Sequence, residues 1–218
     1  MAMADARSSM VDVAFALAGK VLPREHRRAL AEALAPRVPG LADWPGAGVH
    51  RINVSAGAGR EALLSGRSRL TLRVPRDQVD ALSVLSGETL DIGGQPLRLD
   101  GPPRPRDLLP HGTLYAHVVV AASNDEIAFL AAVDDELRRL DIAGRCICGR
   151  LQRFDDPRCY EHPFDDHRQA LPGFSLMIDG LSTAHALRLL DLGVGPRRLW
   201  GCGLFIPHKS AAAVGSER

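Results

Sequence analysis

One order of predicted elements occurs twice in this sequence, and that repetition limits the possible folds more than any other feature. Apolar and alternating segments predict strands, and segments with apolar residues three and four apart predict helices. The first half reads, in order, as a strand, a helix, two strands, a short helix and a hairpin turning at Gly93-Gly94: Val11–Ala18, Pro23 to about Arg37, Val49–Ser55, Ser68–Val74, Arg76–Leu85 and Thr89–Leu99.

A proline-rich segment near the midpoint, Gly101–Pro110 (GPPRPRDLLP), predicts a linker, and the same order returns after it. Ser123 and Glu126 have the spacing of a capping box, and Ser182 is a second predicted cap. The second half reads as Leu114–Ala121 (strand), a helix to about Leu140, Cys146–Phe154 and Phe174–Asp179 (strands), a helix ending at Gly193, and Leu199–Ile206 (strand).

Two tandem β-α-β-β-α-β units predict an α+β protein made of two ferredoxin-like (split βαβ, RRM-like) domains. A chain of 218 residues is long enough for two small domains. We expect an N-terminal domain over residues 1–100, a linker over 101–112, and a C-terminal domain with a glycine-rich segment over 113–218. Helices in such a unit cover one sheet face and leave the other available to a ligand.

Several classes of protein are disfavoured by composition. Hydrophobic residues make up 45% and charged residues 24%, which is ordinary for a folded protein. Apolar stretches such as Thr113–Ala122 are too short to cross a bilayer, and the first residues (MAMADARSSM) lack an apolar signal core. We therefore expect a cytoplasmic protein. Cys146-x-Cys148 is not a zinc or redox spacing, so the four cysteines are predicted to be reduced thiols and no cofactor is expected.

His26 is the most suggestive single residue. It precedes Leu30 by four residues and Leu34 by eight, so it shares their inward-facing side of the predicted helix. In the first helical turn the helix dipole opposes formation of the imidazolium. A neutral histidine beside a basic surface can act as a general acid or base. The alternative is a structural histidine that closes the end of the helix.

An arginine-rich strand is the second candidate. Alternation places Arg67, Arg69, Thr71 and Arg73 on one face of the predicted strand and apolar residues on the other. The net charge of the chain is only +1, but residues 66–76 contain no acid. Such segregated charge can bind phosphate, for which the arginine fork is well suited. A solvated basic strand with acidic neighbours is the alternative.

The glycine-rich run over residues 193–205 is the third candidate. Arg197 and Arg198 precede Gly201 and Gly203, so backbone amides and guanidinium groups could approach a phosphate together. The run leads into a predicted strand rather than a helix, which excludes a dinucleotide-binding fingerprint. Among the other histidines, His50 and Arg51 begin a strand and are predicted to touch substrate. His162 and His167 lie in an acidic stretch, 154–171, read as a solvated loop rather than a metal site.

Taken together, these segments resemble the CRISPR repeat-RNA endoribonucleases of the RAMP superfamily, in the branch first associated with Myxococcus-type systems. The resemblance covers most of the chain and is weakest over Cys148–Leu171. The matching residues are Val11–Leu17, Leu22-Pro23 with His26 and Leu30, Val49-His50-Arg51, Arg67–Pro75 and Gly193–Pro207.

The resemblance implies a CRISPR repeat RNA as partner and cleavage without a metal. The ribose 2′-hydroxyl would attack the adjacent phosphate and leave a 2′,3′-cyclic phosphate and a 5′-hydroxyl. His26 stands where the family commonly places its catalytic histidine, and Lys20, Ser68 and Tyr115 stay open as a second catalytic group. By the same resemblance, Arg67, Arg69 and Arg73 would hold phosphates. The Gly201–Gly203 segment, with Arg197 and Arg198, would hold the repeat.

Three other functions fit parts of the pattern. A non-catalytic RNA-binding subunit of an interference complex would share the fold but use His26 structurally. A tandem ferredoxin-like regulatory domain would use the arginines as ordinary surface. An acylphosphatase-like enzyme would need an arginine and asparagine cradle that the sequence does not contain.

Overall fold

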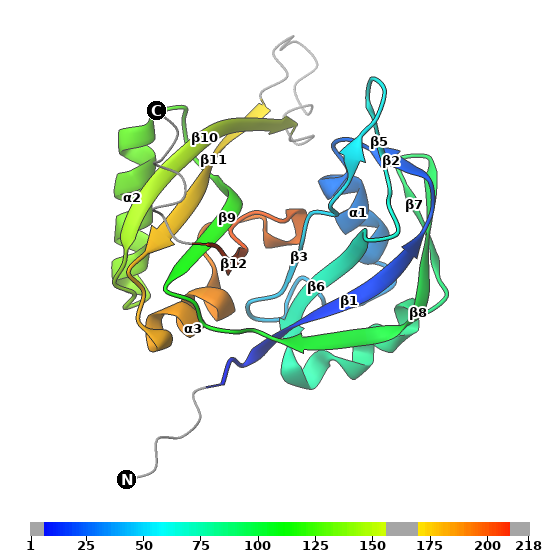
Figure 1. Cartoon of the computed structure of the whole chain (residues 1–218), viewed down its shortest axis with the longest axis horizontal. Helices are drawn as coiled ribbons and strands as arrows, with labels where there is room; N and C mark the ends of the chain where they lie inside the picture. Colours follow the sequence, from blue (N-terminus) through cyan, green and yellow to red (C-terminus); the bar gives the residue numbers. More distant parts are fainter. Residues whose placement is uncertain (1–6, 156–169, 210–218) are drawn as a thin grey trace. The chain divides into compact units, whose positions relative to one another are not determined.

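The computed structural model describes residues 7–155 and 170–209 (Figure 1). These residues form two compact units, each with its own antiparallel sheet. The N-terminal unit extends to Leu109 and also contains Arg198–Gly201, and the C-terminal unit contains the rest. The predicted combination of helices and antiparallel sheets is therefore confirmed.

The N-terminal unit is built on a five-stranded sheet in the order β3-β6-β1-β8-β7, with every neighbouring pair antiparallel (Figure 1). A second, smaller sheet has the order β2-β5-β4. Two 3₁₀ segments stand where the sequence predicts a second helix. The elements are β1 (Met10–Ala18), β2 (Val21–Pro23), α1 (Arg27–Leu34), β3 (Gly48–Val49), β4 (Ser55–Ala56), β5 (Glu61–Leu63), β6 (Arg69–Pro75), η1 (Arg76–Gln78), η2 (Asp80–Leu85), β7 (Thr89–Ile92) and β8 (Gln95–Asp107).

Alternation along β1 and β6 separates the two faces of this sheet. Val13 and Phe15 from β1 and Leu72 from β6 are fully buried in one hydrophobic core with Leu30 and Leu34 of α1. They alternate with Asp12 and Ala14 in β1 and with Thr71 and Arg73 in β6, because successive side chains in a strand point to opposite faces. Apolar residues thus fix which face of the sheet α1 covers. The opposite face, which carries Asp12, Thr71 and Arg73, is called the polar face below.

The C-terminal unit has a four-stranded antiparallel sheet in the order β10-β11-β9-β12. Asp125 caps α2 by accepting hydrogen bonds from the amides of Ile127 and Ala128, and Ser182 caps α3 by accepting from His185. The elements are β9 (Thr113–Val120), α2 (Glu126–Arg139), β10 (Arg145–Asp155), β11 (Ala170–Asp179), α3 (Thr183–Leu192), η4 (Arg198–Trp200, in the N-terminal unit) and β12 (Phe205–Pro207).

Some predicted boundaries differ from the structure. Pro23 ends β2, and α1 begins only at Arg27. The predicted linker is mostly strand, since β8 continues to Asp107 and pairs with β1 as far as Val11. Prolines are accepted there although a proline cannot donate to a ladder. The first strand, the Gly93-Gly94 hairpin and the Ser182 cap are confirmed.

Two further differences concern the ends of elements in the second half. The cap of α2 is Asp125 rather than Ser123, because the Asp125 carboxylate reaches the amides of the first turn. The predicted last strand over Leu199–Ile206 is a 3₁₀ turn, Arg198–Trp200, followed by the short β12. Between this turn and β12, Gly201 and Gly203 adopt φ angles of +74° and +65°, which interrupt the extended backbone.

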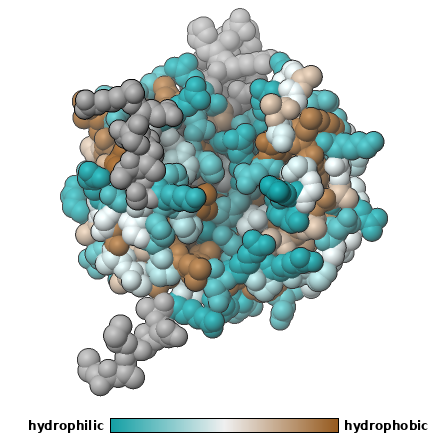
Figure 2. Space-filling model, viewed as in Figure 1, coloured by the Kyte–Doolittle hydropathy of each residue, from teal (hydrophilic) through white to brown (hydrophobic). Residues whose placement is uncertain are grey.

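On the face that Figure 2 shows, hydrophilic residues predominate and apolar residues form scattered patches. No helix among the described residues is long and apolar enough to span a membrane. Of the acidic stretch 154–171, residues 156–169, with Cys159, His162 and His167, lie outside the described residues, so the role predicted for them stays a prediction; β10 and β11 extend into its two ends.

Candidate functional site

His26 is fully buried and occupies the N-cap position of α1. Its Nδ1 lies 3.0 Å from the carbonyl oxygen of Pro23, and the amide of Ile52 donates to its Nε2 at 3.3 Å. A carbonyl only accepts and an amide only donates, so the ring is neutral with its proton on Nδ1. Burial lowers the pKa of His26, against the opposing effect of the Pro23 hydrogen bond. Both nitrogens therefore hold backbone in place.

The predicted inward orientation of His26 is thus correct, and its geometry is that of the structural alternative. The ring ties the start of α1 to the segment after β3 through Ile52. In this arrangement neither nitrogen is available to exchange a proton with a substrate. The catalytic role assigned by resemblance stays a prediction, and it requires that at least one of these two hydrogen bonds be broken.

Arg73, predicted to bind phosphate, is instead paired inside the protein. Its side chain is 1% exposed, and Nε and Nη2 donate to the two carboxylate oxygens of Asp12 at 2.8 and 3.0 Å. Asp12 lies directly opposite Arg73 in the β1–β6 register. The sequence segment around Arg73 contains no acid, but the neighbouring strand supplies one. The prediction of a phosphate contact at Arg73 is corrected accordingly.

His50 belongs to the same charged cluster. Its amide donates to the carbonyl oxygen of Thr71 at 2.9 Å, which fixes the residue after β3 against β6. Its Nε2 lies 3.2 Å from Oδ1 of Asp12, and its side chain is 17% exposed. We call Asp12, His50 and Arg73 the charged cluster. It lies on the polar face of the sheet and spans the adjacent strands β1 and β6 and the residue that follows β3.

Asp12 is ionised within this cluster. Burial by itself raises the pKa of Asp12, but hydrogen bonds and charges from His50 and Arg73 outweigh it and hold the pKa far below its ordinary value. An ionised carboxylate only accepts hydrogen bonds. Sequence reasoning missed Asp12. Its signal was available, since it is the single charged residue in the apolar segment Val11–Ala18.

The other two arginines of the basic segment differ from Arg73. Arg69 is exposed and begins β6, and its Nη1 donates to the backbone oxygens of Gly66 and Ser68 at 2.9 and 2.6 Å. It thereby stabilises its own turn. Arg67 lies before the strand and is exposed. Of the three predicted phosphate ligands, the structure leaves Arg67 and part of the Arg69 guanidinium facing solvent.

Arg51 is exposed and adds a second positive charge close to His26 and Arg27. Although the residue as a whole is exposed, partial desolvation of the guanidinium and then the positive charge of Arg27 lower the pKa of Arg51, while Glu25 opposes the shift. Glu25 supplies a negative charge here, with its Oε1 3.6 Å from Nε of the buried Arg27.

Two of the residues predicted to hold the repeat RNA, Arg198 and Gly201, pack within the N-terminal unit. Arg198 donates through Nη2 to the carbonyl oxygen of Gly46 at 2.8 Å and through Nε to that of Ala47. A Cβ at Gly201 would lie 3.0 Å from the Val49 carbonyl oxygen. Arginine and glycine here serve the packing of this segment against the backbone before β3.

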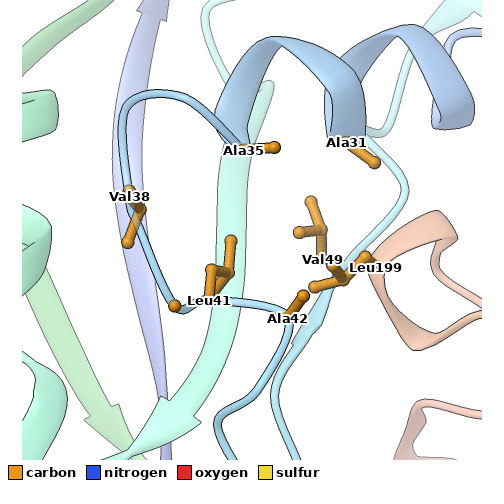
Figure 3. Close-up of a pocket in the computed structure, with 8 residues that line it drawn as sticks. Ala31, Ala35, Val38, Leu41, Ala42, Val49 and Leu199 are labelled. Carbon is orange, nitrogen blue, oxygen red and sulfur yellow. The ribbon is translucent and has the colours of Figure 1, made fainter.

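Leu199 completes this packing in a small apolar pocket (Figure 3). The side chains that line it come from α1, the turn after it, β3 and η4: Ala31, Ala35, Val38, Leu41, Ala42, Val49 and Leu199. No charged or hydrogen-bonding side chain is among them, so the pocket offers no polar group to orient a nucleotide. We interpret it as a packing gap of the N-terminal unit.

Gly203 and Arg197 belong to the C-terminal unit. The amide of Gly203 donates to Val118 at 2.8 Å, and a Cβ on Gly203 would stand 1.8 Å from the Val194 carbonyl oxygen. Glycine at 203 is therefore required for backbone packing. Arg197 adopts a φ of +66°, in the left-handed region, just before the chain enters η4.

The three residues left open as second catalytic groups have different environments. Ser68 is buried, and its hydroxyl donates to the Asn53 carbonyl oxygen at 2.7 Å, which is a structural role. Lys20 is exposed at the end of β1. Tyr115 of β9 is half-buried and stacks edge-on against His117, with ring centroids 5.2 Å apart.

Cys146, Cys148 and Cys202 are free thiols. Burial, with Asp134 as a second cause, raises the pKa of Cys146 to about 12, and burial with Glu126 raises that of Cys148 to about 11. Neither is an activated nucleophile. In the part of the chain that is described, no group of three or more His, Cys, Asp or Glu side chains could hold a metal ion.

Comparison with solved structures defines the class of fold. A protein described as "CRISPR associated protein Cas6" superimposes with a TM-score of 0.65 at 8% identity, covering 92% of this chain and all of the other. A structure described as "An RAMP protein binding different RNA substrates" superimposes with a TM-score of 0.56 at 12% identity, covering 89% of this chain and 98% of the other. A Cas6-related protein from Pyrococcus furiosus superimposes with a TM-score of 0.55 at 12% identity, covering 90% of this chain and 98% of the other. This chain therefore has the same type of fold as these Cas6 and RAMP structures.

The sequence itself establishes the family. The Cas6 family model, described as Cas6 Crispr, matches residues 11–210. The "CRISPR-associated endonuclease Cas6" of Myxococcus xanthus (strain DK1622) is 34% identical over 210 residues, which cover 95% of this chain and 85% of that protein. This chain belongs to the Cas6 family, and the resemblance drawn from its sequence is confirmed.

Proposed function

We propose that this protein is an endoribonuclease that binds CRISPR repeat RNA and cleaves precursor RNA without a metal ion. The observation that carries the proposal is the 34% identity, over 95% of the chain, to the M. xanthus CRISPR-associated endonuclease. The 2′-hydroxyl of one nucleotide attacks the adjacent phosphate, so the products end in a 2′,3′-cyclic phosphate and a 5′-hydroxyl. No water is consumed, and the protein has to move protons and stabilise charge on the phosphate.

Each unit is proposed to be ferredoxin-like. In that fold the first and third strands of a β-α-β-β-α-β unit lie at the centre of the sheet. The C-terminal order β10-β11-β9-β12 has this arrangement, with β9 and β11 central. The N-terminal order β3-β6-β1-β8 has it too, with β7 added beyond β8 and 3₁₀ turns in place of the second helix.

Arg51 and Arg67 are the proposed phosphate contacts. Both are exposed, and Arg51 is close enough to Arg27 for their charges to interact. Phosphate contacts of this kind fix the position of an RNA and carry little sequence information. Two other predicted contacts are engaged inside the protein. Arg73 donates to Asp12, and Arg198 donates to the carbonyl oxygen of Gly46, so both contribute to the shape of the site.

Proton transfer in this reaction requires a histidine or an equivalent group near neutral pH. The family resemblance points to His26, whose ring must first release Pro23 or Ile52. RNA that binds Arg51 would shift the neighbouring Ile52 and so break its hydrogen bond to His26.

The test mixes purified protein with the CRISPR repeat RNA of its host in excess EDTA and follows cleavage at single turnover. Wild type is expected to cut at one position and to leave a cyclic phosphate, detected by mass spectrometry of the 5′ fragment. His26→Ala is compared for binding and for cutting, with folding checked by circular dichroism. Cleavage that depends on added Mg²⁺ would contradict metal independence.

A non-catalytic RNA-binding subunit of a CRISPR interference complex is the second candidate. One observation favours it: both ring nitrogens of His26 are occupied by backbone groups. Under this function wild type and His26→Ala both bind repeat RNA, and neither cuts it at any pH between 6 and 9. Loss of binding by Arg51→Ala and Arg67→Ala, with a weaker salt dependence, is expected of either function.

A further inference from the structure

The charged cluster has the geometry of an oriented acid–base group. Arg73 and Asp12 face one another across β1 and β6, and Gly48, two residues before His50, faces Arg73 from the other side. Arg73 is 1% exposed, Asp12 20% and His50 17%, so exposure to water increases along the cluster from Arg73 to the other two. The imidazole of His50 has a second ring nitrogen besides the one that faces Asp12.

Asp12 determines the tautomer of His50. The carboxylate can only accept, so His50 donates its Nε2 proton to Oδ1 at 3.2 Å. In the neutral imidazole Nδ1 then carries a lone pair and no proton. Within residues 7–155 and 170–209, Nδ1 of His50 makes no hydrogen bond. A carboxylate on one ring nitrogen and a free lone pair on the other is the arrangement of a general base.

Arg73 keeps this carboxylate in place. Nε of Arg73 donates to the same Oδ1 that receives the His50 proton, and Nη2 occupies Oδ2. The two bonds of a planar guanidinium fix the plane of the carboxylate, so they also fix the direction in which the imidazole is held. A group that is positioned before the substrate arrives loses less entropy in the reaction.

We propose that His50 is the general base of RNA cleavage, with Asp12 and Arg73 as positioning residues. This inference rests on the proposed endoribonuclease function and assigns its proton transfer to a different histidine from His26. The 2′-oxygen bonds to phosphorus as its proton passes to Nδ1 of His50, and the P–O5′ bond breaks. The 5′-oxygen gains a proton from water, and the imidazolium returns its proton to solvent, so the reaction balances.

His50 and His26 differ in their unoccupied acceptor sites. Among the described residues, Nδ1 of His50 accepts no hydrogen bond. His26, by contrast, has no lone pair that is not already accepting a hydrogen bond. The structure therefore offers one histidine, His50, with an unoccupied ring nitrogen, and one, His26, whose two ring nitrogens are both engaged.

Chemical rescue tests the assignment. In His50→Gly the space of the ring is open to free imidazole, which can replace a catalytic histidine but cannot replace one that only stabilises the fold. Single-turnover cleavage of the host's repeat RNA is measured in EDTA, with and without about 100 mM imidazole. We expect cleavage to fall by about 10²- to 10⁴-fold, RNA affinity to change by less than about threefold, and imidazole to restore at least about tenfold.

His50→Gln is the second variant, in case glycine disturbs the fold. The glutamine amide can still donate to Asp12 but cannot accept a proton from the 2′-hydroxyl. It should fold and bind like wild type, cut about 10²-fold or more slowly, and gain nothing from imidazole. His26→Gly is the matched control, which imidazole should not rescue.

The outcomes separate the two proposals. Cleavage by His50→Gln at the wild-type rate, or rescue of His26→Gly and not of His50→Gly, overturns the role of His50 and leaves the endoribonuclease standing. Binding without cleavage by wild type overturns the proposed function, and the role of His50 with it. Loss of RNA binding equal to the loss of cleavage in His50→Gln would make His50 a binding residue.

Discussion

Replacing Arg73 should destabilise the N-terminal unit rather than weaken RNA binding. Its guanidinium is 1% exposed and forms two hydrogen bonds with Asp12, at 2.8 and 3.0 Å. Removing one partner of a buried ion pair costs about 3–5 kcal/mol, because the other charge remains buried. Asp12 is 20% exposed and keeps some contact with water, so we expect about 3 kcal/mol for Arg73→Ala, at the lower end of the range.

Tryptophan fluorescence during urea unfolding measures the loss of stability of the N-terminal unit. The chain has two tryptophans, and both Trp44 and Trp200 belong to the N-terminal unit. With a denaturant slope of about 1.5 kcal/mol per molar, typical of a small domain, the urea midpoint should fall by about 2 M. Arg98→Ala is the matched control. Arg98 pairs with Asp100 at 3.1 Å, but both are exposed, so its loss should cost under about 1 kcal/mol.

A double-mutant cycle isolates the pair. Asp12→Ala and Arg73→Ala are each expected to destabilise, and the double variant should be about 2 kcal/mol more stable than the sum of the two losses predicts. An unchanged urea midpoint in Arg73→Ala would refute this reasoning. It would be refuted more directly if Arg73→Ala unfolded like wild type and lost RNA affinity as Arg67→Ala does.

Three further predictions concern other parts of the chain. Gly201→Ala should cost about 1–2 kcal/mol in the same urea assay, because φ is +74° and the new Cβ would lie 3.0 Å from the Val49 oxygen, whereas Gly66→Ala, with open space around it, should be neutral. Asp12 has a folded pKa below its ordinary 3.8, so its contribution to stability is complete above that value and is lost as the pH falls below it; thermal unfolding between pH 5 and 2 should show a shallower loss in Asp12→Asn than in wild type. Cys146 and Cys148, with pKa values raised to about 12 and about 11, should react at pH 8 at least about 10²-fold more slowly than a free thiol, as measured by mass spectrometry of the labelled peptides, and fast labelling of either would contradict the burial of its thiol.

Much of the fold could be predicted because its signals are local. Alternation in Val11–Ala18 and Ser68–Val74 identified two central strands, and Gly93-Gly94 identified a hairpin turn. These signals depend on neighbours within a few residues. Prediction was wrong where the partner was distant. Gly101–Asp107 looks like a linker from its prolines, but pairing with β1 makes it strand.

The candidate site shows the same division more sharply. The sequence by itself determined the family, the repeated order of elements, the inward orientation of His26 and the face shared by Arg69 and Arg73. It also marked His50 and Arg51 as residues of interest, without a role in proton transfer for either.

Only the tertiary structure decided which charges neutralise one another. Asp12 lies 61 residues from Arg73 and 38 from His50 in the chain, and pairing of β1 and β3 with β6 brings all three together. Likewise, Ile52 reaches His26 across 26 residues, and Arg198 reaches Gly46 across 152. Residue type and spacing restrict what a side chain can do, but its hydrogen-bond partner depends on packing between segments that are distant in sequence, and that partner decides whether a histidine is structural or able to accept a proton.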